Sequence, residues 1–246
     1  MVHTNVAEGV HRSENAYTNW YLLEEDGRVT IVDAGVPTSW ESLHEALRTI
    51  GRSTGDVEAL VLTHAHFDHI GFAERARVGL DIPVWVHEND VPLTMHPLLY
   101  GRERSPLRYF ATQIKAAPIV ASLVRNRAFF AKPLGEVHRF TDGTLDVPGH
   151  PRVVLTPGHT MGHVSFDLPG RDAVIAGDAL VTLNIYTGDV GPQIVAGAAT
   201  ADSVRNLASL DALAELDAGT VLPGHGEPWT QGAAEAVRLA QAAGPS

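Results

Sequence analysis

Residues 59–71 read "ALVLTHAHFDHIG", a short apolar run followed by three histidines and one aspartate within positions 63–69. The apolar run predicts a β-strand, and we expect the chain to turn at its end into a helix over about residues 68–78. Because alternate side chains of an extended segment point the same way, His64 and His66 can bind one metal ion together. Asp68 and His69 follow at the turn and can reach a second position nearby. The motif therefore predicts metal binding at two neighbouring positions.

Three further polar residues have the same setting as this motif. His159 lies in "TPGHTMGH", Asp178 in "IAGDAL" and His225 in "LPGHGEP", and each follows a short apolar run and adjoins a glycine. Glycine lets the backbone turn sharply and brings such side chains to the rim of a sheet, where functional loops gather. A hydrogen-bonded histidine or a surface carboxylate would explain any one of them alone. Together with the first motif they predict one metal centre built at four strand ends.

The order, spacing and flanking glycines of these motifs resemble those of the metallo-β-lactamase superfamily of hydrolases. The resemblance runs from "TIVDAG" at residues 30–35 to "LPGHG" at residues 222–226, with residues 91–135 as the divergent part. It implies an α/β fold, an αββα sandwich of two mixed β-sheets flanked by helices, with the metals at one edge between the sheets. It also implies two ligand sets: His64, His66 and His159 for the first metal, Asp68, His69 and His225 for the second, and Asp178 as the bridge between them.

The rest of the chain predicts one domain over residues 1–246 with a helical insertion at about residues 91–135, since no repeat or linker divides it. Alternating and apolar runs predict further strands, and amphipathic patterns predict further helices. The expected strands are residues 19–23, 29–35, 83–87, 152–156, 164–168, 173–178 and 220–226, and the expected helices are residues 38–51, 202–216 and 232–243.

The insertion differs in charge from the rest of the chain. It carries seven basic residues and one acidic residue, a local formal charge of +6, whereas the whole chain has 18 basic and 29 acidic residues and a net charge of −11. One interpretation is a surface that meets an anionic or amphipathic small molecule. A solvated helical face and an oligomer interface are the alternatives.

Composition excludes several classes of function. The net charge of −11 argues against binding to nucleic acid or to anionic membranes, so we expect a small-molecule substrate. No apolar run is long enough for a membrane-spanning helix, and the first twenty residues lack the pattern of a signal peptide, from which we expect a cytoplasmic protein. Cysteine is absent, so a metal must be bound by imidazole and carboxylate.

This ligand chemistry suits two divalent ions, with Zn²⁺ as the default and iron or manganese as alternatives. Two ions that share a bridging water lower its pKa and supply hydroxide near neutral pH. Our hypothesis is that this hydroxide attacks a small-molecule ester, lactone or thioester, and that Asp68 acts as a catalytic residue by passing a proton to the leaving group. An aspartate at position 178 departs from the antibiotic-hydrolysing β-lactamases and is similar to the lactonase-like and glyoxalase II-like branch.

Three residues are candidates for supporting roles. Asp33, in "VDAG", resembles a family position that orients groups around the metals, and His163 is predicted to be a hydrogen-bond partner rather than a ligand. Tyr186 resembles a tyrosine of the lactonase branch that assists an oxyanion, with core packing as the alternative.

Other functions share much of this pattern. A persulfide dioxygenase uses one iron at positions that correspond to His64, His159 and Asp178, and it oxidises its substrate. A phosphodiesterase of the same fold and a metal-binding member without turnover are the remaining alternatives.

Overall fold

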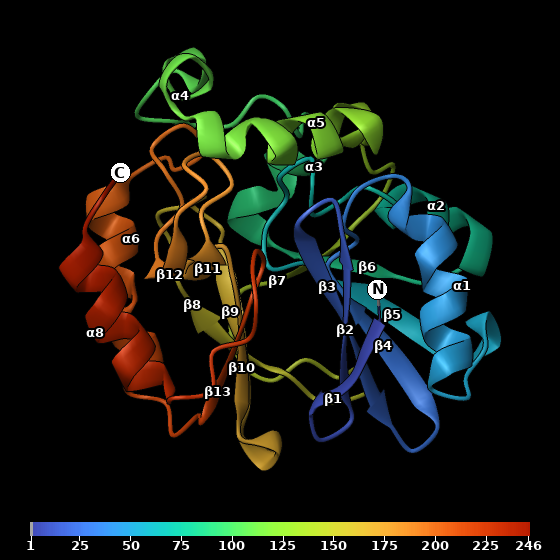
Figure 1. The fold of residues 1–246 in the computed structure, drawn as a ribbon. Coiled ribbons are helices and arrows are strands. Elements are labelled where there is room, and N and C mark those ends of the chain that lie inside the picture. Colours follow the sequence, from blue (N-terminus) through green and yellow to red (C-terminus); the bar gives the residue numbers. More distant parts are fainter. Residues whose placement is uncertain (1) are drawn as a thin grey trace.

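The computed structural model describes residues 2–246, and Figure 1 shows two β-sheets lying face to face between outer helices. Helices α1 (Ser39–Thr49) and α2 (Ala73–Leu80) cover one sheet. Helices α6 (Ser203–Ser209), α7 (Asp211–Ala214) and α8 (Ala233–Ala243) lie outside the other. This is the predicted αββα sandwich.

The first sheet has seven strands in the order of the sequence. Its first four strands pair antiparallel, and its last four form parallel pairs, so the sheet is mixed. Two of its strands, β1 and β2, precede the first strand that the sequence predicts. The strands are β1 (Val2–Ala7), β2 (Val10–Asn15), β3 (Thr18–Glu25), β4 (Arg28–Val32), β5 (Val57–Val61), β6 (Val84–His87) and β7 (His138–Phe140).

The second sheet has four strands in the order β13-β10-β9-β8. The β10–β13 pair is parallel and the other two pairs are antiparallel, so this sheet is also mixed. A separate two-stranded ribbon of β11 (Val181–Leu183) and β12 (Val190–Gln193) lies in the chain between β10 and β13 of this sheet. The strands of the second sheet are β8 (Arg152–Leu155), β9 (Val164–Leu168), β10 (Ala173–Gly177) and β13 (Thr220–Pro223).

Strand β3 explains why both faces of the first sheet are covered. Successive side chains of a strand point to opposite faces. Trp20 and Leu22 pack among the residues of the helices α1 and α2, whereas Tyr21 and Leu23 pack between the two sheets. All four are at most 1% exposed, so the apolar run that predicts this strand supplies two hydrophobic layers at once.

Helix α2 begins at Ala73, so the predicted start near residue 68 is wrong. The backbone between them forms a turn that bonds across to the loop after β4. Ala34 donates to the carbonyl of His69 at 2.6 Å, and Gly71 donates to that of Gly35 at 2.8 Å. A Cβ at Gly71 would lie 2.2 Å from the Gly35 oxygen, so glycine is required for this close approach. The turn keeps the polar motif at the sheet edge instead of winding it into a helix.

The predicted helix over residues 202–216 is also interrupted, because α6 ends at Ser209 and α7 starts at Asp211. Leu210 between them is fully buried against the second sheet.

Residues 91–135 leave the first sheet after β6 and return to it at β7. They are largely helical and lie across one end of the sandwich, at the top of Figure 1. Within residues 2–246, no helix has the length and apolar character needed to cross a membrane. The helices of this region are α3 (Val91–Met95), α4 (Pro106–Thr112), η3 (Ile114–Ala116), α5 (Ala117–Arg125) and η4 (Ala128–Phe130). The short helix η2 (Glu88–Asp90) directly precedes it, and η1 (Thr54–Asp56) and η5 (Pro169–Arg171) lie elsewhere in the chain.

Candidate metal centre

The fold gathers all seven predicted ligand residues at one edge of the sandwich. Four of them follow β5 in the first sheet, and the other three follow β8, β10 and β13 in the second. A backbone hydrogen bond from Val164 to the carbonyl of Thr63, 2.9 Å long, joins the two sheets beside them. The seven side chains are between 0% and 4% exposed, and they are His64, His66, Asp68, His69, His159, Asp178 and His225.

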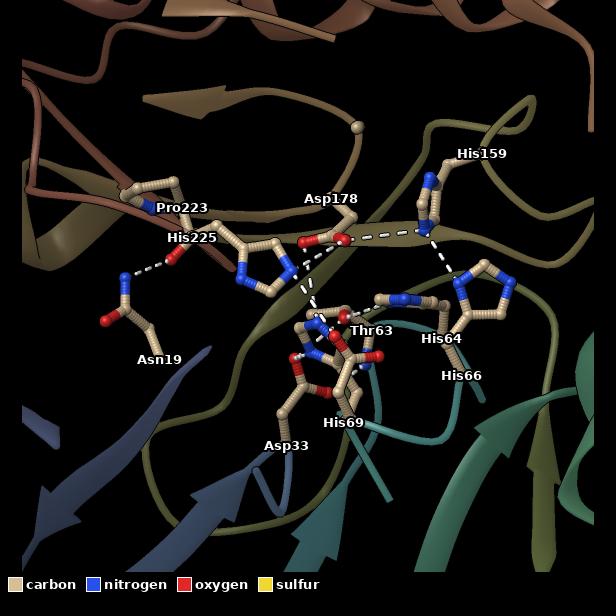
Figure 2. Close-up of polar contacts among 12 residues, drawn as sticks. Asn19, Asp33, Thr63, His64, His66, His69, His159, Asp178, Pro223 and His225 are labelled. Carbon is tan, nitrogen blue, oxygen red and sulfur yellow. Dashed lines mark hydrogen bonds and ion pairs between the residues drawn. The ribbon is translucent and has the colours of Figure 1, made fainter. Parts of the chain in front are cut away.

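Asp178 lies at the middle of this cluster, with imidazole rings around it (Figure 2). Its carboxylate oxygens are 3.2 Å from Nε2 of His225, 3.4 Å from Nε2 of His159 and 3.5 Å from Nε2 of His69. Asp178 thus approaches histidines that come from both sheets.

Three groups within the cluster could each hold a cation, since their ligand atoms lie within 4.8 Å of one another. Within the first group, Nδ1 of His66 and Nε2 of His159 are 2.9 Å apart. The geometry therefore brings together two separate sets of donors plus one carboxylate that adjoins both. The groups are His64, His66 and His159; His64, His69 and Asp178; and Asp68, His69 and His225.

Hydrogen bonds on the outer nitrogens fix the direction of three rings. Nδ1 of His64 is 3.0 Å from the hydroxyl of Thr63, that of His69 is 2.9 Å from Asp33 Oδ2, and that of His225 is 2.7 Å from the carbonyl of Tyr17. An imidazole that donates through Nδ1 to an oxygen presents Nε2 on its other side. These contacts aim the Nε2 atoms of all three residues at the centre of the cluster.

Asp33 is the residue that connects two of these contacts. Its carboxylate also accepts hydrogen bonds from the amide and the hydroxyl of Thr63, both 2.8 Å long. Its backbone has a φ of 60°, in the left-handed region. Asp33 therefore holds the start of the 63–69 segment and the ring of His69 together.

Burial and neighbouring charges make the cluster suited to a cation. Burial, with the other imidazoles, holds the pKa of His64 well below its usual value, and burial lowers the pKa of His66 to about 3. Burial also opposes the charged form of His69, but the carboxylates of Asp178 and Asp33 outweigh it and raise that pKa to about 10. The neutral imidazoles of His64 and His66 thus stand close to carboxylates that attract positive charge.

The donor set fits a divalent transition metal. Nε2 of His64 is buried and has no hydrogen-bond partner among the residues that the structure describes. A buried polar atom of this kind is costly unless another group satisfies it. Imidazole nitrogen and carboxylate oxygen in a dry site are ligands that zinc and iron accept.

His163 lies behind the cluster and supports Asp178. Its Nε2 accepts hydrogen bonds from the amides of Asp178 and Ala179, 3.0 and 3.1 Å long, and its Nδ1 is 2.9 Å from the hydroxyl of Thr156. Both ring nitrogens are therefore engaged away from the centre. Gly177 allows this approach, since it has a φ of 52° and a Cβ there would lie 2.8 Å from the His163 ring.

Tyr186 is buried at the side of the cluster that faces residues 91–135. Its hydroxyl is hydrogen-bonded to that of Tyr100, and burial raises the pKa of Tyr186 well above its usual value. The ring of Tyr100 in turn lies 4.2 Å from that of His66, measured between ring centroids. Tyr100 therefore connects Tyr186 to His66 at the edge of the metal centre.

Two supporting residues were not found from the sequence. Asn19, on β3, donates to the carbonyls of Pro223 and Gly226 at 2.9 and 2.7 Å, and so holds the loop that carries His225 (Figure 2). Asp90 accepts hydrogen bonds from two other loops. The partners of both residues lie far away in the chain, so no local pattern could indicate them.

Asp90 is a buried carboxylate that joins the two loops of the first donor group. It accepts hydrogen bonds from the Ala65 amide at 3.0 Å, the Thr160 hydroxyl at 2.8 Å and the Gly162 amide at 2.8 Å. Burial raises its pKa to about 6, although these three hydrogen bonds favour the charged form. Asp90 thereby fixes the segment of His64 and His66 relative to that of His159.

We expect Asp90→Asn to destabilise the protein by about 1–3 kcal/mol. The NH₂ group of asparagine would face the buried N–H and O–H groups that now donate to the carboxylate, and two donors cannot form a hydrogen bond with each other. Chemical unfolding measures the change, and metal content per chain reports whether the loops separate. Glu88→Gln, at an exposed position of the same short helix, is the matched control. Equal stability and equal metal content in both variants would contradict this role.

Comparisons with known proteins agree with the fold and with the character of the centre. A family model described as the metallo-beta-lactamase superfamily matches residues 15–225. The probable metallo-hydrolase YflN of Bacillus subtilis (strain 168) is 29% identical over 237 residues, which cover 91% of this chain and 86% of that protein. The probable metallo-hydrolase YqgX of the same strain is 30% identical over 174 residues, which cover 70% of this chain and 68% of that protein.

Two solved structures are similar over most of the chain. The metallo-beta-lactamase family protein TTHA1429 of Thermus thermophilus has a TM-score of 0.69 and 27% identity, and the match covers 96% of this chain and 79% of that one. TTHA1623, solved in a di-iron-bound form, has a TM-score of 0.60 and 29% identity, with 89% and 93% covered.

Proposed function

Because this chain belongs to the metallo-beta-lactamase superfamily, we propose that it is a metal-dependent hydrolase that cleaves a small-molecule ester, lactone or thioester. The family match and the metallo-hydrolase relatives support hydrolysis, and the superfamily binds divalent metals. The observation that carries the proposal is the convergence of five buried histidines and two buried aspartates at one sheet edge.

We assign the ligands to two positions. His64, His66 and His159 form the first set, Asp68, His69 and His225 form the second, and Asp178 lies between them. The first and third donor groups of the structure contain these same residues, and Asp178 adjoins both. Zinc suits this nitrogen and oxygen set, and the di-iron form of TTHA1623 makes iron the main alternative.

When bound, two such cations would supply hydroxide near neutral pH and polarise the carbonyl oxygen of the substrate. The chain's own groups then set the geometry. Asp33, Thr63 and the carbonyl of Tyr17 keep the imidazole rings directed inward.

Asp68 is the proposed proton carrier of the reaction. Its carboxylate is buried, and Oδ2 lies 3.6 Å from Nε2 of His225, at the side of the second donor set. From this position it would pass a proton to the leaving group as the ester bond breaks.

The test combines metal analysis with a substrate screen. We expect two zinc ions per chain and hydrolysis of lactones, carboxylic esters or thioesters by the metal-loaded protein, but not of a chromogenic lactam. Hydrolysis of phosphodiesters alone would refute the carbonyl substrate while leaving the metal centre in place. One iron per chain with oxygen uptake would replace hydrolysis by the dioxygenase reaction.

A further inference from the structure

A cavity of about 240 Å³ lies between the metal centre and residues 91–135. Most of its lining is apolar, and its wall combines residues from beside the centre with residues of the insertion. Six of the lining residues are Phe67, Tyr100, Val120, Leu123, Phe129 and Ile185.

The inner end of this cavity is lined by residues that stand beside the metal centre. Phe67 stands in the chain between His66 and Asp68, two of the proposed ligands. Tyr100 also lines the cavity, and its ring packs on the ring of His66. A substrate group that fills the cavity would therefore extend from a point beside the proposed reaction centre.

The outer wall comes from the insertion. Val120 and Leu123 lie on α5, and Phe129 lies on η4, with its ring stacked on that of Phe67 at a centroid distance of 4.9 Å. Among the lining residues that the structure describes, Arg102 is the one that carries a charge. Arg102 is exposed, so its guanidinium group can stay in water while the methylene groups of its side chain cover apolar surface.

We propose that this cavity is the acyl pocket of the enzyme and that it selects substrates with an unbranched or aromatic acyl group of roughly eight carbons. The estimate of chain length follows from filling about 240 Å³ at the packing density of about 0.75 found in protein interiors. The inference rests on the proposed hydrolysis, since it names the part of the ester that lies beside the centre. An acyl chain is recognised here by burial of apolar surface rather than by hydrogen bonds.

The first experiment measures kcat/KM for p-nitrophenyl esters with acyl groups from two to twelve carbons. Burial of each added methylene should raise kcat/KM by about three- to fourfold until the pocket is full. We expect a rise to about eight carbons and no further gain beyond that length. A flat series from acetate to dodecanoate would overturn the pocket.

The matched variants lie on one helix. Val120→Phe narrows the cavity from a half-buried position and should move the preferred acyl group of the ester series to shorter chains. Val124→Phe, one turn later at a position that is 58% exposed and outside the lining, should leave the whole series unchanged. If both variants gave the same dependence of kcat/KM on acyl chain length, the assignment of this cavity as the acyl pocket would be refuted.

A binding measurement separates this inference from the proposed function. Calorimetry with 1-octanol on the purified protein should detect binding that Val120→Phe weakens at least about tenfold and Val124→Phe does not change. If no ester is hydrolysed but this binding is found, the proposed function fails and the pocket stands. If esters are hydrolysed without regard to chain length and 1-octanol does not bind, the pocket fails and the function stands.

Discussion

Asp178→Asn should lower kcat/KM for the best ester substrate by at least about 10³ and reduce metal content to one ion per chain or fewer. The carboxylate is 3% exposed and lies within 3.5 Å of histidines from both proposed donor sets. Asparagine keeps the size of the side chain but loses its negative charge and one acceptor oxygen. Loss of a shared ligand affects both positions at once.

The charge of Asp178 is also tied to its neighbours. Burial opposes the ionised carboxylate, but His225 and His69 outweigh burial and hold its pKa well below the usual value. Without that carboxylate, two buried imidazoles lose a partner of opposite charge. The effect on metal binding should therefore exceed that of changing a supporting residue, which typically costs about 10–100-fold in affinity.

Metal content and steady-state rates measured on the same preparation check this prediction. Asp146→Asn changes the same chemical group at an exposed position and is the matched control. Circular dichroism of both variants shows whether the fold is retained. If the folded Asp178→Asn protein kept two metal ions and the original rate, Asp178 would not be a ligand of the metal centre.

Removal of the metals should lower the melting temperature by roughly 8–15 °C. A site filled at about 1,000 times its Kd contributes about 4 kcal/mol to stability, and in a chain of this size 1 kcal/mol corresponds to about 2–4 °C. The cause lies in the cluster itself. Without a cation, buried ligand atoms such as Nε2 of His64 have no partner, and this lowers the stability of the folded state.

Differential scanning calorimetry before and after dialysis against a chelator measures the shift. Adding back Zn²⁺ or Fe²⁺ should restore the melting temperature, whereas Mg²⁺ should not, because Mg²⁺ prefers a shell of oxygen ligands. An unchanged melting temperature in metal-depleted protein, or equal recovery with Mg²⁺, would argue against a site of imidazole ligands.

The resemblance to the metallo-β-lactamase superfamily predicts the sandwich, and short-range patterns in the sequence are enough to single out the residues that meet at its edge. Each of these residues follows an apolar run at the end of a strand, and the packing of the two sheets brings the ends of β5, β8, β10 and β13 to one edge. His163 is singled out by its place four residues after His159, and Asp33 by its resemblance to a family position.

Features that depend on partners far along the chain could not be predicted. No sequence motif marks Asp90, and only the folded chain shows that it accepts hydrogen bonds from the amides of residues 65 and 162. The turn before α2 is another case, because part of its backbone bonds to residues 34 and 35 rather than continuing into a helix. The shape of the cavity likewise depends on how residues 91–135 pack over the edge, which periodicity does not determine.

The separation of the donor residues along the chain has a consequence for how the protein matures. The rings of His66 and His159 meet across 93 positions, and the ring of His225 reaches the carbonyl of Tyr17 across 208. The complete set of ligands therefore exists only after both sheets have docked, late in folding. Stable loading should thus follow folding, and a cell short of metal should accumulate folded protein that can still be activated.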